Sequence, residues 1–214
     1  MKQFTESLSE VLRGPLPGIE AQKRMMPRAE TLFDRFSIEV KKGAKEGAVL
    51  LLLYPKDGDI FFPLTLRQTY NGAHSGQISF PGGKIEPTDD SPTDTALRET
   101  QEELGINRSS IQILGKLTDL FIMASNFNVR PVVGYVSEVP DFKIDNREVA
   151  EVIEISIGQL LDTRLVKEKE MKVNNKYPIQ APYFDFGGYH VWGATAMMLS
   201  EFKELIKGKG IAAF

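Results

Sequence analysis

The stretch from Ser91 to Gly105 carries both a start signal and a stop signal for one helix, and the rest of the chain has to accommodate that helix. Ser91 suits the N-cap because its hydroxyl can accept a hydrogen bond from a free backbone N–H, and Pro92 suits the first helical position. Asp94 falls where a capping box places its acid. Gly105 can take a positive φ, which favours a helix that ends just before it. The sequence therefore predicts a helix over residues 92–104.

One face of this helix is apolar and its flank is acidic. The positions expected to pack on the protein recur at offsets of three and four: Ala96, Leu97, Thr100 and Leu104. At about 100° per residue, Glu99 and Glu103 lie one above the other, with Glu102 beside them on an exposed flank. These carboxylates repel one another, and Arg98 relieves only part of that repulsion, so a divalent cation is expected. Hard oxygen ligands suit Mg²⁺ or Mn²⁺.

A glycine pair precedes the helix. Residues 77–80 predict a short strand that delivers Gly82 and Gly83 to the helix start. Because a glycine has no Cβ, its backbone carbonyl can approach an ion or a phosphate closely. A Glu pair alone is typical of a solvated surface, but the glycines, the capped helix and the three acids together favour a functional site.

The stretch from Gly83 to Gly105 resembles a Nudix box, the signature of hydrolases that cleave nucleoside diphosphates linked to another moiety. The usual box runs G-x5-E-x7-R-E-U-x-E-E-x-G-U, where U is a bulky aliphatic residue. Here Thr100 takes the first U position, and the loop is one residue longer, so Asp89 or Asp90 stands where the early Glu belongs. These departures, together with segments 64–67 and 74–80, resemble the coenzyme A pyrophosphatase branch.

The resemblance implies roles for individual residues. The implied catalytic residues are Arg98, Glu99, Glu102, Glu103 and Glu148. The resemblance implies one further carboxylate from this region, which serves either as a metal ligand or as the general base. Glu148 is assigned to this role, with Glu151 and Glu154 as the alternatives. The implied metal ligands are the carbonyl of Gly82 with Glu99 and Glu103, and Glu102 on a second ion. The implied substrate-binding residues are Arg67, His74, Gly83 and Phe127. Glu86 would hold the loop through Arg98.

Composition limits the class of protein. With 214 residues, 42% hydrophobic and 26% charged, the chain resembles an ordinary soluble globule. A formal net charge of -3 argues against a nucleic-acid partner, because such proteins generally show a basic surface. The chain has no cysteine, which excludes thiol catalysis and favours the cytoplasm. No apolar run approaches the length of a membrane span, so we expect no membrane partner.

Several segments predict a mixed sheet. Residues 48–54 form a continuous apolar run, typical of a strand buried on both faces, and Asp57-Gly58 predicts a hairpin into residues 60–67. Strands are also expected within 111–122 and 129–136. Alternating strands and helices favour an α/β or α+β fold, which the resemblance sharpens to a Nudix-type α/β/α sandwich with a loop–helix–loop motif.

The two ends of the chain predict additions to this core. Residues 4–13 keep the spacing of an amphipathic helix, and residues 14–23 read as a connector. Residues 167–172 alternate in charge and predict a solvated face. Residues 183–192 predict a strand or hairpin whose aromatic residues could close the pocket or form a homodimer interface, and a closing helix follows. We expect a single domain over 1–214, with an N-terminal extension (1–44), a core (45–160) and a C-terminal extension (161–214).

By resemblance, the expected activity is metal-dependent hydrolysis of a pyrophosphate bond, in coenzyme A or its acyl derivatives, to 3′,5′-ADP and 4′-phosphopantetheine. ADP-ribose or a dinucleotide is the alternative substrate, because Asn71 and Gly72 stand where the branch usually has a Leu followed by a basic residue. A non-catalytic nucleotide-binding regulatory module is the alternative from another class. The intact set Glu99, Glu102 and Glu103 weighs against it.

Overall fold

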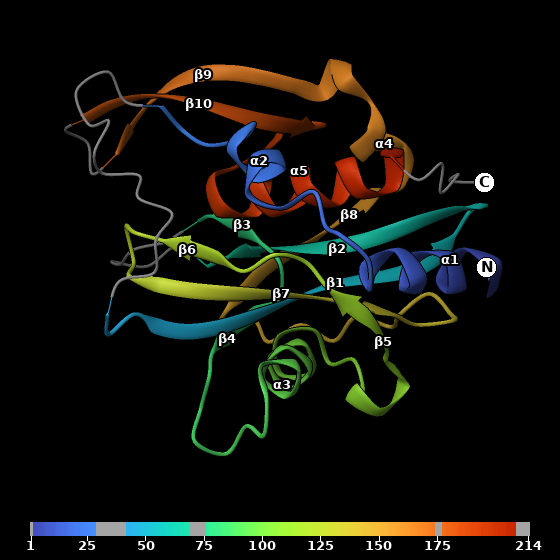
Figure 1. Ribbon diagram of the computed structural model, residues 1–214. Helices are drawn as coiled ribbons and strands as arrows, with labels where there is room; N and C mark the ends of the chain where they lie inside the picture. The colour runs from blue at the N-terminus through green and yellow to red at the C-terminus, as the bar shows by residue number, and fades with distance from the viewer. Residues whose placement is uncertain (1, 29–41, 69–75, 174–176, 209–214) are drawn as a thin grey trace.

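The computed structural model describes residues 2–28, 42–68, 76–173 and 177–208 of the chain (Figure 1). The predicted N-terminal amphipathic helix is present as α1 (Lys2–Leu12). The prediction of a connector over residues 14–23 is wrong in part, because helix α2 (Gly18–Lys23) lies within it. Pro17 starts that helix: its φ of -59° and ψ of -29° are helical, and a proline is tolerated where no N–H partner is needed.

The central sheet has β2, β1 and β7 at its centre. In the described part of the chain its eight strands are β1 (Lys45–Lys56), β2 (Asp59–Arg67), β3 (Ile78–Ser79), β4 (Gly82–Lys84), β5 (Gln112–Lys116), β6 (Leu120–Ile122), β7 (Phe127–Tyr135) and β8 (Val149–Ser156). The predicted hairpin turn is confirmed, with Asp57 and Gly58 at φ values of 51° and 80°. β1 is antiparallel to β2 and β4 but parallel to β7, so the sheet is mixed.

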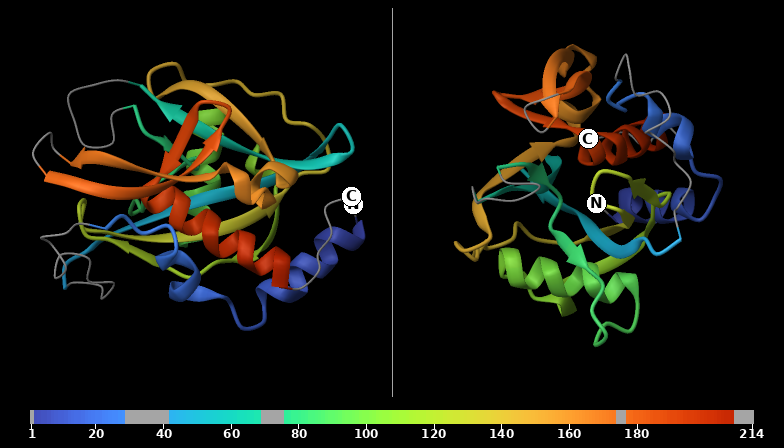
Figure 2. Two further views of the ribbon diagram at one scale, coloured as in Figure 1. Left: turned by 90° about the horizontal axis from the view of Figure 1, so that it is seen from above. Right: turned by 90° about the vertical axis from the view of Figure 1, so that its left-hand side faces the viewer.

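Helices cover both faces of this sheet. The remaining elements are α3 (Pro92–Leu104), a 3-10 turn (Arg108–Ser110), α4 (Ile157–Leu161), a second 3-10 turn (Thr163–Leu165) and α5 (Gly193–Gly208). Figures 1 and 2 show α3 on one side of the sheet and α5 with α2 on the other. Ala48, Leu50 and Leu52 of β1 pack with α3, whereas Leu51 and Leu53 join the cluster on the opposite face. The run is continuously apolar because both faces are covered.

A small second sheet lies over α5 (Figures 1 and 2). It contains β9 (Val166–Val173), β10 (Tyr177–Phe186) and β11 (Tyr189–Trp192), in the order β11-β10-β9. The predicted hairpin over 183–192 and the closing helix are confirmed. The charged segment 167–172 lies within β9, at the edge of this sheet. No helix in the described ranges is long and apolar enough to span a membrane.

A buried carboxylate joins α5 to distant parts of the chain. Glu201 is fully buried, and its oxygens accept hydrogen bonds from the Gly18 N–H (3.1 Å) and the Gln22 amide (2.8 Å). Thr118 donates to the same carboxylate from its hydroxyl (2.6 Å) and its backbone N–H (3.2 Å). Four donors therefore compensate the burial of one charge, as a buried carboxylate requires.

Candidate functional site

Helix α3 begins and ends where the sequence predicts. The Asp94 N–H donates to the Ser91 hydroxyl at 3.2 Å, and Gly105 has a φ of 71° with its N–H donating to Gln101 at 2.9 Å. The Asp94 carboxylate accepts from the backbone N–H of Asp90 at 3.4 Å. Both ends are thus fixed by contacts within a few residues, and they set which side chains point to the sheet.

The three acids of α3 differ in burial. The Glu103 side chain is 2% exposed, that of Glu99 is 15% exposed and that of Glu102 is 60% exposed. The prediction of a shared exposed flank is therefore wrong for Glu103 and Glu99 and holds only for Glu102. The segment after β7 covers the end of the helix, since the backbone N–H of Lys143 donates to Leu104 and that of Asp145 donates to Glu103.

Burial changes the acidity of Glu103. Its pKa is raised to about 8, chiefly by desolvation and to a smaller extent by the nearby charges of Glu99 and Glu148. The Arg67 guanidinium and a backbone hydrogen bond from Gly82 act in the opposite direction. Within the described residues, the buried Oε2 atom of Glu103 has no hydrogen-bond partner. A buried acceptor in this state costs about 1–3 kcal/mol, so this oxygen is suited to a cation.

Arg67 brings two predicted site residues together. It is the last residue of β2, and its guanidinium lies 3.4 Å from Glu103 Oε1 and 3.7 Å from Glu148 Oε2. Glu151 and Glu154, which compete with Glu148 for a role, are engaged elsewhere. Glu151 accepts from the Tyr189 hydroxyl, and Glu154 accepts from Tyr54 and Lys56.

Arg98 is anchored by Asp89. Its Nε and Nη2 donate to the two Asp89 oxygens at 2.9 and 3.0 Å, and its Nη1 donates to Glu99 at 2.9 Å and Glu102 at 3.2 Å. The expectation that Glu86 holds the loop through Arg98 is wrong, because within the described residues Glu86 bonds to Asp89: its backbone N–H donates to the Asp89 carboxylate at 2.9 Å and its carbonyl accepts from the Asp89 N–H at 3.0 Å. The turn that closes on Asp89 therefore puts that carboxylate, not Glu86, against the guanidinium. Arg98 keeps the pKa of Asp89 well below its usual range.

Both glycines at the start of β4 are needed for close approach. Gly82 has a φ of 153°, and a Cβ there would collide with the backbone of Ala48 and Val49 across the β1–β4 pair. A Cβ on Gly83 would overlap the Glu99 carboxylate. The missing side chain at Gly83 thus makes the space in which Glu99 lies against the strand.

An aromatic ring lies near the same loop. Phe127 at the start of β7 is half-buried, and the Lys45 ammonium lies 5.5 Å from its ring centroid. A Cβ on Gly47 would be 2.8 Å from the Gly83 carbonyl and 3.3 Å from the Phe127 ring, so the ring lies close to Gly83. Sequence reasoning missed Lys45, which no motif marks. His74, also predicted to bind substrate, lies outside the described residues.

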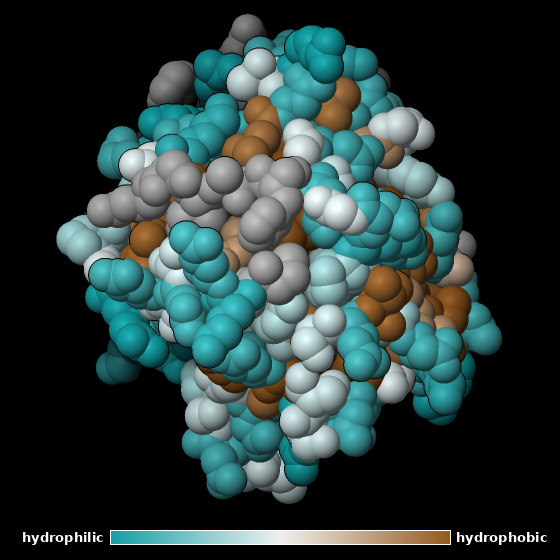
Figure 3. All heavy atoms as spheres, turned by 90° about the vertical axis from the view of Figure 1, so that its right-hand side faces the viewer, coloured by the Kyte–Doolittle hydropathy of each residue, from teal (hydrophilic) through white to brown (hydrophobic). Residues whose placement is uncertain are grey.

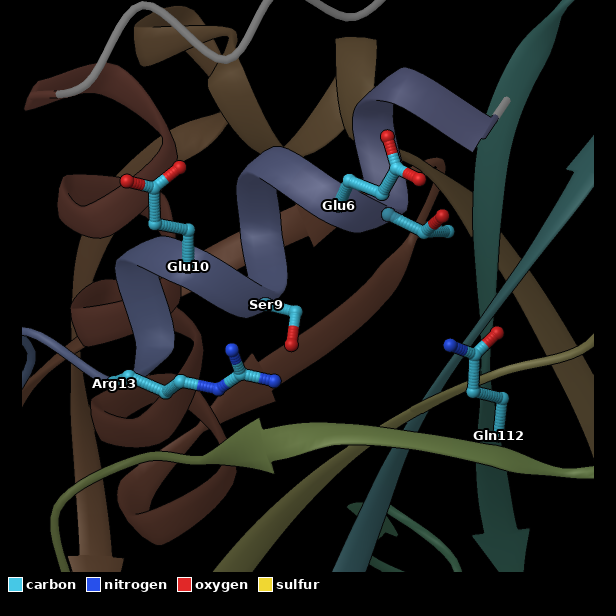
Figure 4. A pocket seen from close by; sticks show the side chains of 6 residues that line it. Glu6, Ser9, Glu10, Arg13 and Gln112 are labelled. Atoms are coloured by element: carbon cyan, nitrogen blue, oxygen red, sulfur yellow. The ribbon is translucent and has the colours of Figure 1, made fainter.

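A separate surface depression of about 540 Å³ lies between α1 and β5. Figure 4 shows Glu6, Ser9, Glu10 and Arg13 of α1 on one side of it and Gln112 of β5 on the other. This end of the molecule is mostly hydrophilic in Figure 3. The lining residues come from neither α3 nor the loop at Gly82 and Gly83, so the depression is not part of the site described above.

A family model described as NUDIX domain matches residues 44–179, which is more than half of the chain. The chain belongs to the Nudix family. It is 33% identical over 172 residues to Nudix hydrolase 3 of Caenorhabditis elegans, covering 72% of this chain and 70% of that protein. It is 35% identical over 137 residues to the uncharacterized Nudix hydrolase NudL of Yersinia enterocolitica, covering 64% of this chain and 69% of that protein.

The Nudix fold is found in solved structures as well. The Nudix hydrolase RenU from M. smegmatis matches with a TM-score of 0.51 at 16% identity, covering 78% of this chain and 89% of that chain. This likeness concerns the fold alone and confirms the predicted α+β architecture with a mixed sheet. Together with the family match, it identifies the protein as an enzyme of the Nudix hydrolase family.

Nudix hydrolases use divalent metal ions, and the residues present here fit such an ion. Among the described residues, no three His, Cys, Asp or Glu side chains are already gathered around one point. Arg98 lies between Glu99 and Glu102, and Arg67 lies beside Glu103. The unpartnered Glu103 oxygen, and the Glu99 carboxylate that lies against Gly83, nevertheless provide the hard oxygen donors that Mg²⁺ or Mn²⁺ prefers.

Proposed function

We propose that this Nudix enzyme hydrolyses the pyrophosphate bond of coenzyme A or its acyl derivatives, yielding 3′,5′-ADP and 4′-phosphopantetheine or its acyl form. The observation that carries the proposal is the position of Arg67. It ends the segment 64–67 that resembles the coenzyme A branch, and it lies within 3.7 Å of both Glu103 and Glu148. A planar guanidinium is well suited to bind a diphosphate beside acidic groups.

The acids of α3 would hold the metal. Glu99, Glu103 and the Gly82 carbonyl would bind one Mg²⁺ or Mn²⁺, and Glu102, the most exposed acid, would bind a second. A bound divalent cation neutralises the diphosphate and lowers the pKa of an attacking water. Arg98 fixes the orientation of Glu99 through its bonds to Asp89.

The remaining residues would bind the substrate and accept a proton. Glu148 is the proposed general base, because its partner Arg67 also contacts Glu103, whereas Glu151 and Glu154 are bonded to Tyr189 and Tyr54, away from the acids of α3. On the strength of the family resemblance, Gly83 is proposed to contact the diphosphate. Phe127 would stack on the nucleobase of the substrate, with Lys45 beside its ring. His74 is also proposed to contact substrate on the strength of the family resemblance.

The test is a panel of substrates with Mg²⁺ or Mn²⁺: coenzyme A, acetyl-coenzyme A, ADP-ribose and a dinucleotide, with products identified by mass spectrometry. We expect coenzyme A and its acyl form to be cleaved fastest, and Glu103→Gln to lower turnover at least 100-fold. If ADP-ribose or the dinucleotide is cleaved faster than coenzyme A, that compound and not coenzyme A is the substrate. Cleavage of coenzyme A at the wild-type rate by Glu103→Gln would refute the metal role of Glu103.

A further inference from the structure

The two arginines of the site are held in different ways. Arg98 is fixed, because Asp89 accepts two hydrogen bonds from it and the carbonyl of Lys84 accepts a third at 3.3 Å. Arg67 is held loosely. Within the described residues, the contacts of its guanidinium are those to Glu103 at 3.4 Å and Glu148 at 3.7 Å.

These lengths matter because charge-assisted N–H···O bonds are usually about 2.7–2.9 Å long. The bonds from Arg98 to Asp89 are near this range, whereas both contacts of Arg67 are longer than it. The Arg67 side chain is also the more exposed of the two, at 24% against 17%. Arg67 can therefore leave its acids at a smaller cost than Arg98 can.

The positive charge of Arg67 also lies close to Glu103, where a metal ion is proposed to bind. Its guanidinium lies 3.4 Å from Oε1 of Glu103, a proposed metal ligand, so a divalent cation on Glu103 would place a second positive charge beside the guanidinium, and the two cations would repel each other. A divalent cation on Glu103 would therefore weaken the contact between Arg67 and that side chain, and the remaining contact, to Glu148, is the longer of the two at 3.7 Å. The freed guanidinium lies at the end of β2, where the proposed diphosphate would bind.

We propose that Arg67 couples the binding of the divalent cation to the binding of the diphosphate. In the free enzyme it pairs with Glu103 and Glu148, and in the cation-loaded enzyme it releases them and bonds to the diphosphate. The inference rests on the proposed function, since it assumes a diphosphate substrate. It adds that Arg67 contributes to diphosphate affinity only after the cation has bound. By linkage, the diphosphate then tightens cation binding by the same factor.

The test measures binding without turnover. The dissociation constant of α,β-methylene-ADP, a diphosphate that cannot be cleaved between its phosphates, is determined by calorimetry with and without Mn²⁺. The proteins are the wild type, Arg67→Gln and Arg130→Gln. Arg130 is the matched control because it is a partly exposed arginine with two acidic partners, Glu46 at 3.3 Å and Asp119 at 3.2 Å, and it lies outside the proposed machinery.

We expect Arg67→Gln to weaken binding of the analogue at least tenfold with Mn²⁺ present and less than twofold without it. Mn²⁺ alone should bind Arg67→Gln at least as tightly as wild type, because a competing cation has been removed. Arg130→Gln should change each constant less than twofold. Thermal melting of each variant shows that it is folded, and Arg67→Lys, which keeps the charge, should retain part of the effect.

Three outcomes would overturn the proposal: an equal loss of analogue affinity with and without Mn²⁺, weaker Mn²⁺ binding by Arg67→Gln, or no analogue binding to the wild type with Mn²⁺. The first would make Arg67 a plain substrate ligand, and the second would make it a support for the metal site. The analogue contains the adenosine diphosphate group that coenzyme A, ADP-ribose and adenine dinucleotides share. If coenzyme A is not the substrate, the proposed coupling can therefore still hold, and the cleavage panel detects that failure separately.

Discussion

Replacing Asp89 with Asn would test whether this residue anchors the acidic site. The Asp89 carboxylate is buried and receives two bonds from Arg98, one from the Thr95 hydroxyl at 2.8 Å and one from the Glu86 N–H at 2.9 Å. An Asn side chain keeps the shape but loses the charge and one acceptor. Arg98 would then retain Glu99 and Glu102 as its charged partners.

The size of the effect follows from burial. Removing one partner of a fully buried ion pair costs about 3–5 kcal/mol. Arg98 is 17% exposed and keeps other acceptors, so we expect Asp89→Asn to lower the free energy of unfolding by about 2–3 kcal/mol at pH 7. The pKa of Asp89 is lower in the folded state than its value of 3.8 in the unfolded chain. The stabilisation that the Asp89 carboxylate provides is therefore present above pH 3.8 and is lost as the pH falls below that value. The difference between variant and wild type should therefore shrink below about pH 4.

Urea unfolding, followed by circular dichroism and by the fluorescence of the one tryptophan, measures this loss. Asp94→Asn is the matched control, because Asp94 lies on the same helix and pairs with Arg108, which is 55% exposed, at 3.3 Å. We expect the control to cost at most about 1 kcal/mol. Equal costs for the two variants, or a difference that does not depend on pH, would refute the assignment of Asp89 as the anchor of Arg98.

Three further predictions concern the glycine loop and the buried acids. Folding raises the pKa of Glu103 from 4.5 to about 8. The contribution of this side chain to the stability of the folded state is therefore fully present below pH 4.5 and is lost as the pH rises to about 8. Glu103→Gln should melt above wild type at pH 9 and lose this advantage at pH 5, and parallel melting profiles would contradict it. Gly83→Ala should lower turnover at least tenfold with little change in melting temperature, because its Cβ displaces Glu99, and unchanged turnover would count against that contact. Glu201→Ala should lower the free energy of unfolding in urea by at least about 3 kcal/mol, because each of its four neutral donors left without an acceptor costs about 1–3 kcal/mol, and a loss below about 1 kcal/mol would show that these donors find other partners.

Features that depend on neighbouring residues could be predicted from the sequence. The ends of α3 are set by Ser91 and Gly105, whose bonds reach only three or four residues along the chain. The strand at residues 48–54 was also predictable, because a continuous apolar run of that length has to be covered on both faces. The helical repeat of about 3.6 residues per turn likewise predicted that Glu99 and Glu103 lie one above the other on α3.

Features that depend on distant residues could not be predicted. The burial of Glu103 results from Arg67 and from a segment that begins at Lys143, about 40 residues further on, and no helical pattern contains that information. The choice between Glu86 and Asp89 as the partner of Arg98 depends on the path of the loop. Residues 167–172 lack apolar alternation, so their place in a strand follows only from their pairing with β10.

The position of α5 in the core has a consequence for synthesis of the protein. Leu199, Phe202 and Ile206 belong to the same apolar cluster as Phe4 near the start of the chain. While the ribosome is still translating α5, the face of the central sheet that α5 covers together with α2 remains partly exposed (Figure 1). The nascent chain is therefore expected to expose part of this apolar cluster until α5 has emerged and packed against it.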